Sequence, residues 1–323
     1  MRVLVIGGTR FIGRAASEAL LAAGHELLII HRGENEPETL TDARHIHVPR
    51  AELAQVRDEI AGFVPAVALD TLALTRDDAD IALRAIPRNC RTVVLSSCDV
   101  YRAYTSRDAG IVTDAVPLDE TAALRSERYP YRGRLPGLDD YEKLDVEAAY
   151  RARGATILRL GFVYGPHDAQ RREEFILRRV RAGRVRIPFG PGNWLLSRSY
   201  VVDAADAIRR AVEMPAAAAE TMNIADARGV TVGLWAQQIL TAAQSAAELV
   251  NVPARSLPQD MAISAAIQQH MLIDSSRAHS VLGWEPSDPT VSVRASVEWH
   301  LANPPAPAHA DFSADDAALA AAR

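Results

Sequence analysis

Short apolar runs alternate with amphipathic stretches through the first half of the chain. The apolar runs lie at Val3–Ile6, Leu27–Ile30, His45–Val48, Val67–Leu69, Thr92–Leu95 and Thr156–Leu160. Stretches with helical periodicity separate most of them, among them Arg14–Ala23, Asp77–Ile86 and Asp140–Arg153. Alternation of this kind is typical of parallel strands that helices cover on both faces. The pattern therefore predicts an α/β protein with a doubly wound parallel sheet.

The pattern becomes less regular after residue 165. Glycine and proline cluster between residues 188 and 192, and a helical stretch at Leu234–Ala247 follows. We expect residues 1–165, with a return segment near 200–225, to form the sheet domain. Residues 166–199 and 226–302 are expected to form a smaller C-terminal lobe. Residues 303–323 are rich in Ala, Pro and Asp, a composition that predicts a flexible tail.

The first strand runs directly into Gly7, Gly8 and Gly13 and then into a helix over Phe11–Ala23. Gly7 and Gly8 allow a tight turn and a close approach of the backbone, and Gly13 lets the helix pack against the strand. The free N–H groups at the start of a helix favour a phosphate. In this setting the glycine motif predicts a site for the pyrophosphate of a dinucleotide, rather than an ordinary strand–helix turn.

Composition narrows the possible functions only slightly. The 323 residues are 48% hydrophobic with a net charge of −5, which is typical of a soluble globular protein with one large domain or two lobes. No run is long enough to span a membrane and no secretory signal precedes the first strand, so we expect a cytoplasmic protein. Two cysteines make neither a disulfide framework nor a zinc site, and no metal is expected. The mild acidity argues against a general nucleic-acid binder.

Seven short blocks together resemble the extended short-chain dehydrogenases, the NAD(P)-dependent epimerase/dehydratase family. They are GGTRFIG at 7–13, LSSCDVY at 95–101, KLDVE at 143–147, LRLGFVYGP at 158–166, RSYVVD at 198–203, NIAD at 223–226 and LGWEP at 282–286. They occur in the family's order and extend to about residue 302. The resemblance implies a Rossmann-type dinucleotide-binding domain, a smaller substrate-binding C-terminal lobe and oxidoreductase chemistry.

The resemblance also implies a catalytic set, from which this chain departs. In the family a serine, here Ser97, polarises the substrate oxygen, and a lysine, here Lys143, holds the nicotinamide ribose. The family's tyrosine precedes the lysine by four residues, where this chain has Asp139, and the atypical pattern leaves the proton donor open. The nearest tyrosine is Tyr141. Two residues turn an ideal helix by roughly 200°, so Tyr141 is expected to face away from Lys143.

Three interpretations of this departure remain open. A distorted first turn of the helix could bring Tyr141 into the cleft. Another residue could transfer the proton, and the candidates are Tyr101, Tyr131, Asp139 and His167. Alternatively, the site carries out no redox chemistry.

Two arginines favour NADP over NAD as the cofactor. Arg10 replaces the middle glycine of the motif, and the second strand ends in His31 and Arg32 with no acidic residue to accept the ribose hydroxyls of NAD. Guanidinium groups bind phosphate oxygens in a fork, which suits a 2′-phosphate. The predicted cofactor-binding residues are Gly7, Gly8, Thr9, Arg10, Phe11, Ile12, Gly13, His31, Arg32, Leu72, Ser96 and Lys143.

The expected substrate is a small polar or anionic molecule. Arg198 matches the arginine that binds the diphosphate in the sugar-nucleotide members of the family. A second family arginine is missing from residues 268–274, which weakens the case for a nucleotide sugar. Tyr131 and Arg132 lie on a loop that precedes the Lys143 helix, and they are expected to contact an anionic substrate.

The resulting hypothesis is an NADP-dependent oxidoreductase or epimerase-like enzyme. One alternative is a non-redox member of the family that binds the dinucleotide as a sensed or structural ligand. A second is an RNA-binding protein like the chloroplast stem-loop binding proteins, whose glycine motif also reads Gly-Gly-Thr-Arg-Phe, although a net charge of −5 counts against it. The resemblance leaves a homodimer open, because the family often dimerises through its lysine helix; Ala148, Ala149 and Ala152 permit such close packing but equally permit packing within the chain.

Overall fold

A seven-stranded parallel sheet forms the centre of the protein. The computed structural model describes residues 1–306 and 311–322. The strand order is β11-β6-β5-β4-β1-β2-β3, and each neighbouring pair is parallel. The strands are β1 (Arg2–Ile6), β2 (Glu26–His31), β3 (Arg44–His47), β4 (Val67–Asp70), β5 (Arg91–Ser97), β6 (Thr156–Leu160) and β11 (Thr221–Ile224). The six predicted apolar runs each contribute one strand, and the doubly wound Rossmann-type sheet is confirmed.

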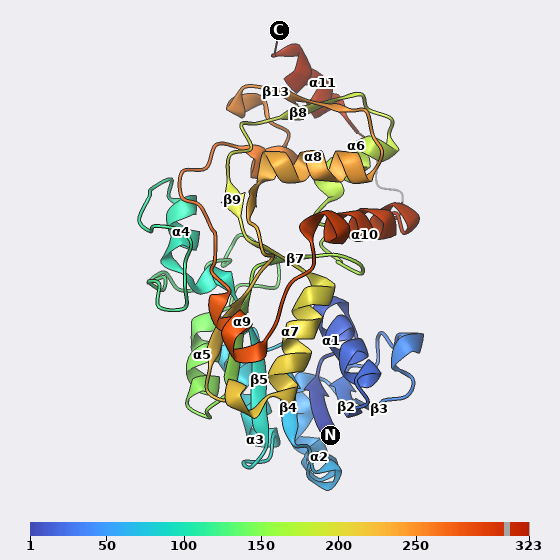
Figure 1. The fold of residues 1–323 in the computed structure, drawn as a ribbon, viewed down its shortest axis with the longest axis vertical. Helices are drawn as coiled ribbons and strands as arrows, with labels where there is room; N and C mark the ends of the chain where they lie inside the picture. The colour runs from blue at the N-terminus through green and yellow to red at the C-terminus, as the bar shows by residue number, and fades with distance from the viewer. Residues whose placement is uncertain (307–310, 323) are drawn as a thin grey trace.

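Helices cover both faces of the sheet because both faces are apolar. Val3 and Val5 of β1 pack with α1 (Phe11–Ala22) and α7 (Val201–Glu213), whereas Leu4 and Ile6 point to the other face. On that face lie α2 (Arg57–Phe63), α3 (Arg76–Ala85) and, farther along the sheet, α5 (Lys143–Arg151). Alternating side chains of each strand thus reach opposite apolar layers. Figure 1 shows α1 and α7 side by side in front of the sheet.

The remaining elements gather mainly beyond the carboxyl ends of the strands (Figure 1). Short strand pairs join β7 to β10, β9 to β12 and β8 to β13. These strands are β7 (Phe162–Tyr164), β8 (Arg186–Phe189), β9 (Leu195–Leu196), β10 (Arg198–Tyr200), β12 (Val230–Thr231) and β13 (Glu248–Asn251). The helices are α4 (Arg102–Asp108), α6 (Glu174–Arg181), α8 (Val232–Ala242), α9 (Ser276–Leu282), α10 (Pro289–Ala302) and α11 (Ser313–Ala320).

The division into domains remains a prediction, and one segment lies elsewhere than expected. Helix α9 falls within residues 226–302, but it packs against α7 and β11 beside the sheet. Among the described helices we find no apolar segment of the length that a bilayer crossing requires.

The structure differs from the flexible tail expected over 303–323. Residues 307–310 and 323 lie outside the described part, but Ser313–Ala320 form α11. The Arg179 guanidinium of α6 donates to both oxygens of Asp315 at 2.7 Å, and neither side chain has exposed surface. Arg179 also contacts Asp260. Composition alone misled here, because the partners that hold α11 are more than fifty residues away in the sequence.

The buried Arg179–Asp315 pair predicts a stabilising role for α11. In Asp315→Asn the buried guanidinium loses one of its two carboxylate partners, and we expect the free energy of unfolding to fall by about 2 kcal/mol. Urea denaturation of the full chain measures this change. The matched control is Asp316→Asn, because Asp316 is exposed and pairs with the surface Arg184; its effect should stay below about 1 kcal/mol. Equal, small effects of both variants would show that α11 adds little to stability.

Candidate active site

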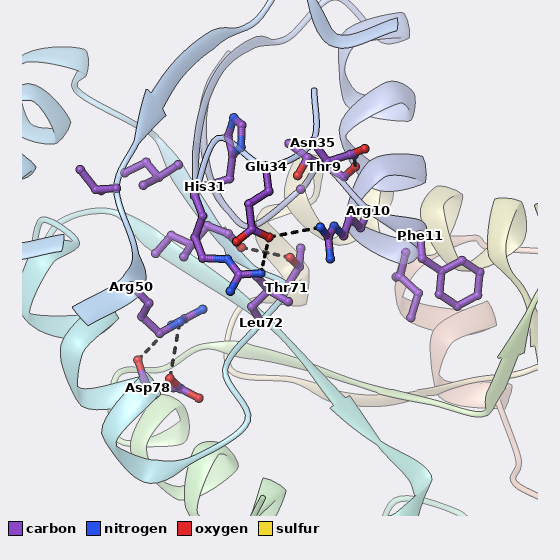
Figure 2. A pocket seen from close by; sticks show the side chains of 18 of the residues that line it. Thr9, Arg10, Phe11, His31, Glu34, Asn35, Arg50, Thr71, Leu72 and Asp78 are labelled. Carbon is purple, nitrogen blue, oxygen red and sulfur yellow. Dashed lines mark hydrogen bonds and ion pairs between the residues drawn. The ribbon is translucent and has the colours of Figure 1, made fainter. Parts of the chain in front are cut away.

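A cavity of about 510 Å³ opens at the carboxyl ends of β1, β2 and β4 (Figure 2). The glycine turn after β1 lines it, and Gly7 and Gly8 adopt left-handed φ values of 94° and 87°. A Cβ atom at Gly13 would lie 2.9 Å from the Cα of Gly8, so the helix can approach the turn only with glycine there. Of the predicted cofactor residues, all but Ser96 and Lys143 line this cavity.

The start of α1 is suited to an anion. Arg10 stands at the N-cap without a side-chain hydrogen bond to the helix, and the first turn holds no acidic residue. The first N–H groups of a helix lack partners within the helix, and the helix dipole places partial positive charge there. The glycine cradle and these N–H groups therefore fit the pyrophosphate of a dinucleotide.

Arg10 and Arg32 converge on one carboxylate that the sequence analysis missed. Nη2 of Arg10 lies 3.2 Å from Oε2 of Glu34, and Nη2 of Arg32 lies 2.8 Å from the same oxygen (Figure 2). All three side chains are exposed at the mouth of the cavity. The two cations thus share one anion and retain one net positive charge. The available signal was the position of Glu34, two residues after Arg32 in the same turn.

The segment 71–74 beside the cavity is held by Asp70. Arg50 donates to its two oxygens at 2.6 and 2.8 Å, and the Tyr150 hydroxyl donates at 2.5 Å. The N–H groups of Leu72 and Ala73 donate to the same carboxylate. Burial opposes the charge, but Arg50, Tyr150 and the Leu72 N–H together outweigh it and hold the pKa of Asp70 below its usual value. A charged Asp70 therefore fixes the backbone that lines the cavity next to the glycine turn.

Four side chains meet at the carboxyl end of β5, near the start of α5. The hydroxyls of Tyr141 and Tyr131 donate to Oδ2 of Asp99 at 2.8 and 2.9 Å. The N–H of Asp99 donates to Oγ of Ser97 at 3.2 Å. Asp99 is buried and its Oδ1 has no hydrogen-bond partner among the described residues, while burial raises its pKa. We call Ser97, Asp99, Tyr131 and Tyr141 the hydroxyl–carboxyl cluster.

Tyr141 joins this cluster because α5 begins later than expected. The predicted helix over Asp140–Arg153 placed Tyr141 inside it, but the helix starts at Lys143 with Glu142 as its N-cap. The rotation of an ideal helix therefore does not apply to Tyr141. Its ring centre lies 5.9 Å from Nζ of Lys143. The structure thus brings Tyr141, Ser97 and Lys143 together through a late helix start rather than through a distorted first turn, and which residue transfers the proton stays a prediction.

Lys143 lies buried beneath the cluster. Its Nζ donates to the carbonyl oxygens of Ala73 at 2.6 Å and Leu95 at 2.9 Å. Burial lowers the pKa of Lys143 to about 8, although Asp70 and Asp99 oppose the shift. The ammonium group thus links β5 and the segment after β4 to the start of α5.

Ser96, predicted to bind the cofactor together with the glycine turn, instead points into the protein interior. The Ser96 hydroxyl donates to Glu147 at 2.7 Å, and Glu147 pairs with Arg159 inside the protein. Successive side chains of a strand point to opposite faces, so only one of two adjacent serines can reach the cleft.

The side chain of Tyr101 is also buried and hydrogen-bonded inside the protein. Its hydroxyl donates to Asn223 at 2.7 Å and accepts from Arg159 at 3.1 Å, and the residue has no exposed surface. Burial raises its pKa to about 12. These contacts remove Tyr101 from the candidates for proton transfer.

Two further candidates lie apart from the cluster. His167 follows β7 with φ of 65°, and its Nδ1 lies 3.3 Å from Nη1 of Arg14 on α1. Its ring packs on Trp299 at 4.6 Å between centres. The carboxylate of Asp139 accepts from the N–H of Gly133 in an exposed loop. Neither residue makes a contact with Ser97 or Lys143 in the described parts of the chain.

The predicted substrate residues are split between interior and surface. Arg198 is only 1% exposed and its guanidinium lies 4.9 Å from the Trp235 ring, so the expected open contact with a diphosphate is not available. Arg132 is exposed and lies 3.2 Å from Asp140. Tyr131, predicted to bind substrate and also named as a candidate for proton transfer, lies in the hydroxyl–carboxyl cluster.

Comparison with known proteins agrees with this architecture. The model of the NAD dependent epimerase/dehydratase family matches residues 3–81 and 141–225. The chain is 24% identical to the chloroplast stem-loop binding protein of 41 kDa b of Arabidopsis thaliana, over 98% of this chain and 84% of that protein. It is 27% identical to the 3-diazoavenalumate denitrifying reductase of a Streptomyces species, over 90% of this chain and 97% of that protein.

A solved structure shows the same fold. UDP-glucose 4-epimerase of Thermotoga maritima, crystallised with UDP-glucose, superposes with a TM-score of 0.70 at 20% identity. The match covers 94% of this chain and 99% of that one.

The lowered pKa of Lys143 predicts a pH-dependent contribution to stability. Below about pH 8 the lysine is charged in both states, and the folded state carries the full cost of burying that charge. Between pH 8 and 10.5 the unfolded chain still holds the proton that the folded chain has released, so stability rises with pH. Relative to Lys143→Met, the wild-type free energy of unfolding should rise by about 3 kcal/mol across this window.

Chemical denaturation of both proteins at a series of pH values measures this difference, and all other titrating groups cancel between them. A difference that stays constant from pH 7.5 to 10.5 would contradict the lowered pKa.

Proposed function

Because this chain belongs to the NAD dependent epimerase/dehydratase family, we propose that it is an NADP-dependent oxidoreductase. Its proposed substrate is a small polar or anionic molecule that carries a ketone or a secondary alcohol. The observation that supports the proposal best is the placement of Ser97, Asp99 and Tyr141 beside Lys143, at the carboxyl end of β5 in the sheet that also bears the dinucleotide cradle.

The proposed cofactor preference rests on charge at the mouth of the cavity. Arg10 and Arg32 are exposed and able to turn toward a 2′-phosphate, which would replace Glu34 as their shared partner. Two guanidinium groups bind a phosphate more strongly than a single carboxylate between them, because the phosphate offers more oxygens and more charge. Glu34 is the competing feature, since a carboxylate in this turn could accept hydrogen bonds from ribose hydroxyls.

The proposed mechanism divides the work among residues of the cluster. A bound nicotinamide would exchange a hydride with the substrate carbon. Ser97, which is half-buried, and Tyr141 would donate hydrogen bonds to the substrate oxygen, and Tyr141 would pass its proton to that oxygen during reduction. For this step the Tyr141 hydroxyl would turn from Asp99 to the substrate oxygen. A protonated Asp99, favoured by the burial that raises its pKa, would return a proton to the phenolate and regain one from solvent. Lys143 lies outside the cavity with its Nζ bonded to two backbone carbonyl oxygens, so its proposed role is to stabilise negative charge on Tyr141 rather than to hold the ribose.

We propose that the loop over residues 124–138 contributes to the substrate site. Tyr131 of this loop already reaches Asp99, and its hydroxyl also lies 3.0 Å from that of Tyr104. The loop therefore stands at the cluster, where Arg132 could meet an anionic substrate group. We also propose that the smaller lobe binds the substrate. A homodimer is likewise only a proposal.

Similarity to a stem-loop binding protein raises the possibility of RNA binding. Ion pairs between arginines and acidic residues of this chain count against it. RNA affinity depends on free cationic groups that neutralise phosphates. The arginine-rich segment 171–186 instead contacts its own carboxylates. The pairs include Arg172–Asp168, Arg178–Asp260, Arg179–Asp315, Arg181–Glu174 and Arg184–Asp316. In the loop over residues 124–138, the buried Arg125 likewise pairs with Glu142.

The arginine pair predicts the affinity for the two cofactors. Arg32→Ala should weaken NADPH binding about 30-fold, since a charge-assisted hydrogen bond is worth about 2 kcal/mol, and should leave NADH binding nearly unchanged. Glu34→Gln should tighten NADPH binding, because it removes the competing carboxylate. Fluorescence titration with NADPH and NADH measures both effects. Arg76→Ala is the matched control, since Arg76 is also an exposed arginine paired with a carboxylate.

The opposite pattern would identify an NAD site. In that case Glu34→Gln weakens NADH binding, and Arg32→Ala leaves NADPH binding as it is in the wild type.

The cluster predicts which hydroxyl is needed for turnover. Tyr141→Phe keeps the ring but removes the transferable proton, and we expect the rate of NADPH-dependent ketone reduction to fall by about 10²- to 10⁴-fold. The NADPH dissociation constant should stay the same, because the phenol lies outside the cavity. Stopped-flow absorbance with a panel of hexuloses and α-diketones measures the rate. Tyr200→Phe, which changes a hydroxyl on β10 outside both the cluster and the 124–138 loop, is the control.

Asp99→Asn separates the proposed proton relay from simple positioning. The amide keeps a hydrogen bond to Tyr141 but cannot return a proton, so turnover should fall while cofactor affinity holds. If the wild type binds NADPH yet reduces none of the ketones, the non-redox alternative is favoured instead.

A further inference from the structure

Three histidines and a glutamate meet at the outer edge of the sheet, beside the cavity. His31 ends β2, His45 and His47 lie on the edge strand β3, and Glu36 lies in the segment that joins the two strands. The parallel register pairs His31 with His47. Because alternate residues of a strand share a face, His45 and His47 point the same way. One ligand atom from each of the four residues lies within 4.8 Å of the others.

The spacing of these atoms matches the first shell of a tetrahedral metal ion. Nε2 of His31 lies 3.3 Å from Oε1 of Glu36 and 2.9 Å from Nδ1 of His45, and Nδ1 of His45 lies 3.8 Å from the same oxygen. Nε2 of His47 also contacts this oxygen. Metal–nitrogen bonds of about 2.0–2.1 Å place the ligands of a tetrahedral zinc ion roughly 3.4 Å apart. The observed separations fall on both sides of that value.

We propose that His31, Glu36, His45 and His47 bind a divalent transition metal ion of the Zn²⁺ class. Neutral imidazoles and one carboxylate are the donors that such an ion prefers in proteins. An assembly of acidic residues alone would suit Ca²⁺ or Mg²⁺ instead. The expectation of no metal site considered only the two cysteines. The signal that it missed is a His-x-His pair on a strand next to another strand that ends in histidine.

The surroundings hold His45 in the orientation that metal binding needs, whereas His31 must give up one hydrogen bond to bind the ion. Nε2 of His45 lies 2.9 Å from the carbonyl oxygen of Leu40, which places the proton on Nε2 and leaves Nδ1 free to face the ion. At His31 the N–H of Gly33 donates to Nδ1 over 3.2 Å. A metal bound at Nε2 moves the ring proton to Nδ1, so this long contact must open. Gly33 has φ of 78° and adjoins the exposed Arg32 turn, where such a movement costs little.

The ion would stabilise the turn that carries Arg32 and Glu34, the side chains proposed to select the cofactor. Residues 32–35 connect His31 to Glu36, so a metal bound to both ends would close this short loop, which holds Arg32 and Glu34. The inference does not depend on the proposed reductase activity, since its evidence is the geometry of four side chains outside the hydroxyl–carboxyl cluster.

Zinc titration of the untagged full chain tests the site. After removal of metals by EDTA and exchange into metal-free buffer, isothermal titration with Zn²⁺ should give one ion per chain. His47→Ala and Glu36→Gln should each weaken binding about tenfold or more, since changes around a metal site commonly cost 10- to 100-fold. Both residues are exposed, so the variants should keep the wild-type circular dichroism spectrum. Co²⁺ in place of Zn²⁺ should give the intense visible absorption of tetrahedral coordination.

The control is His279→Ala, because His279 also lies beside a glutamate, with Nδ1 3.4 Å from Oε1 of Glu285, but has no further histidine partner. It should bind Zn²⁺ like the wild type. Absence of stoichiometric binding to the wild type would overturn the proposal, and so would equal affinities of the His47→Ala and His279→Ala variants. Loss of cofactor binding or turnover with intact zinc binding would instead contradict only the proposed function.

Discussion

The buried ion pair between Arg125 and Glu142 determines the geometry of the candidate catalytic cluster. Arg125 contacts both oxygens of Glu142, and the N–H groups of Tyr129 and Leu144 donate to the same carboxylate. The contact with Leu144 makes Glu142 the N-cap of α5, so the helix begins at Lys143. Arg125 also donates to the carbonyl oxygen of Asp99. A single pair thus sets the start of α5 and ties it to the residue that both phenols contact. Ion pairs of this kind are weak evidence for net stability, but they can specify one arrangement among several.

The fold was largely predictable because its signals are local. Each strand of the first half is a short apolar run, and the glycine turn after β1 is read from adjacent residues. The strand β11 carries the sequence Thr-Met-Asn-Ile, which mixes polar and apolar residues, and it is recognised as a strand only from its pairing with β6. The same local reading failed for α11, because Ala and Asp are common in disordered tails and the decisive contact comes from Arg179.

The candidate site was predictable in its cofactor half and much less so in its catalytic half. Cofactor residues cluster in the sequence, since one turn and one strand end supply most of them. The residues of the hydroxyl–carboxyl cluster come instead from β5, from the turn after it and from the loop before α5. Tyr141 was placed on the wrong side of Lys143 because helical periodicity was applied to a residue that precedes the helix. Ser96 was included because two adjacent serines at a strand end look alike until the alternation of faces separates them.

Whether an arginine can bind a ligand depends more on its partners in the fold than on the number of arginines in the sequence. Arg198 and Arg179 are both buried, but Arg198 stacks on Trp235 and makes no ion pair within the described residues, whereas Arg179 pairs with two aspartates. Neither is available to a ligand at the surface. Arg10 and Arg32 differ because their shared partner, Glu34, is exposed at the mouth of the cavity. Solvent screens the attraction there, and a competing anion can replace the Glu34 carboxylate. A strong, buried partner makes an arginine structural, whereas a weak, exposed partner leaves it able to recognise a phosphate.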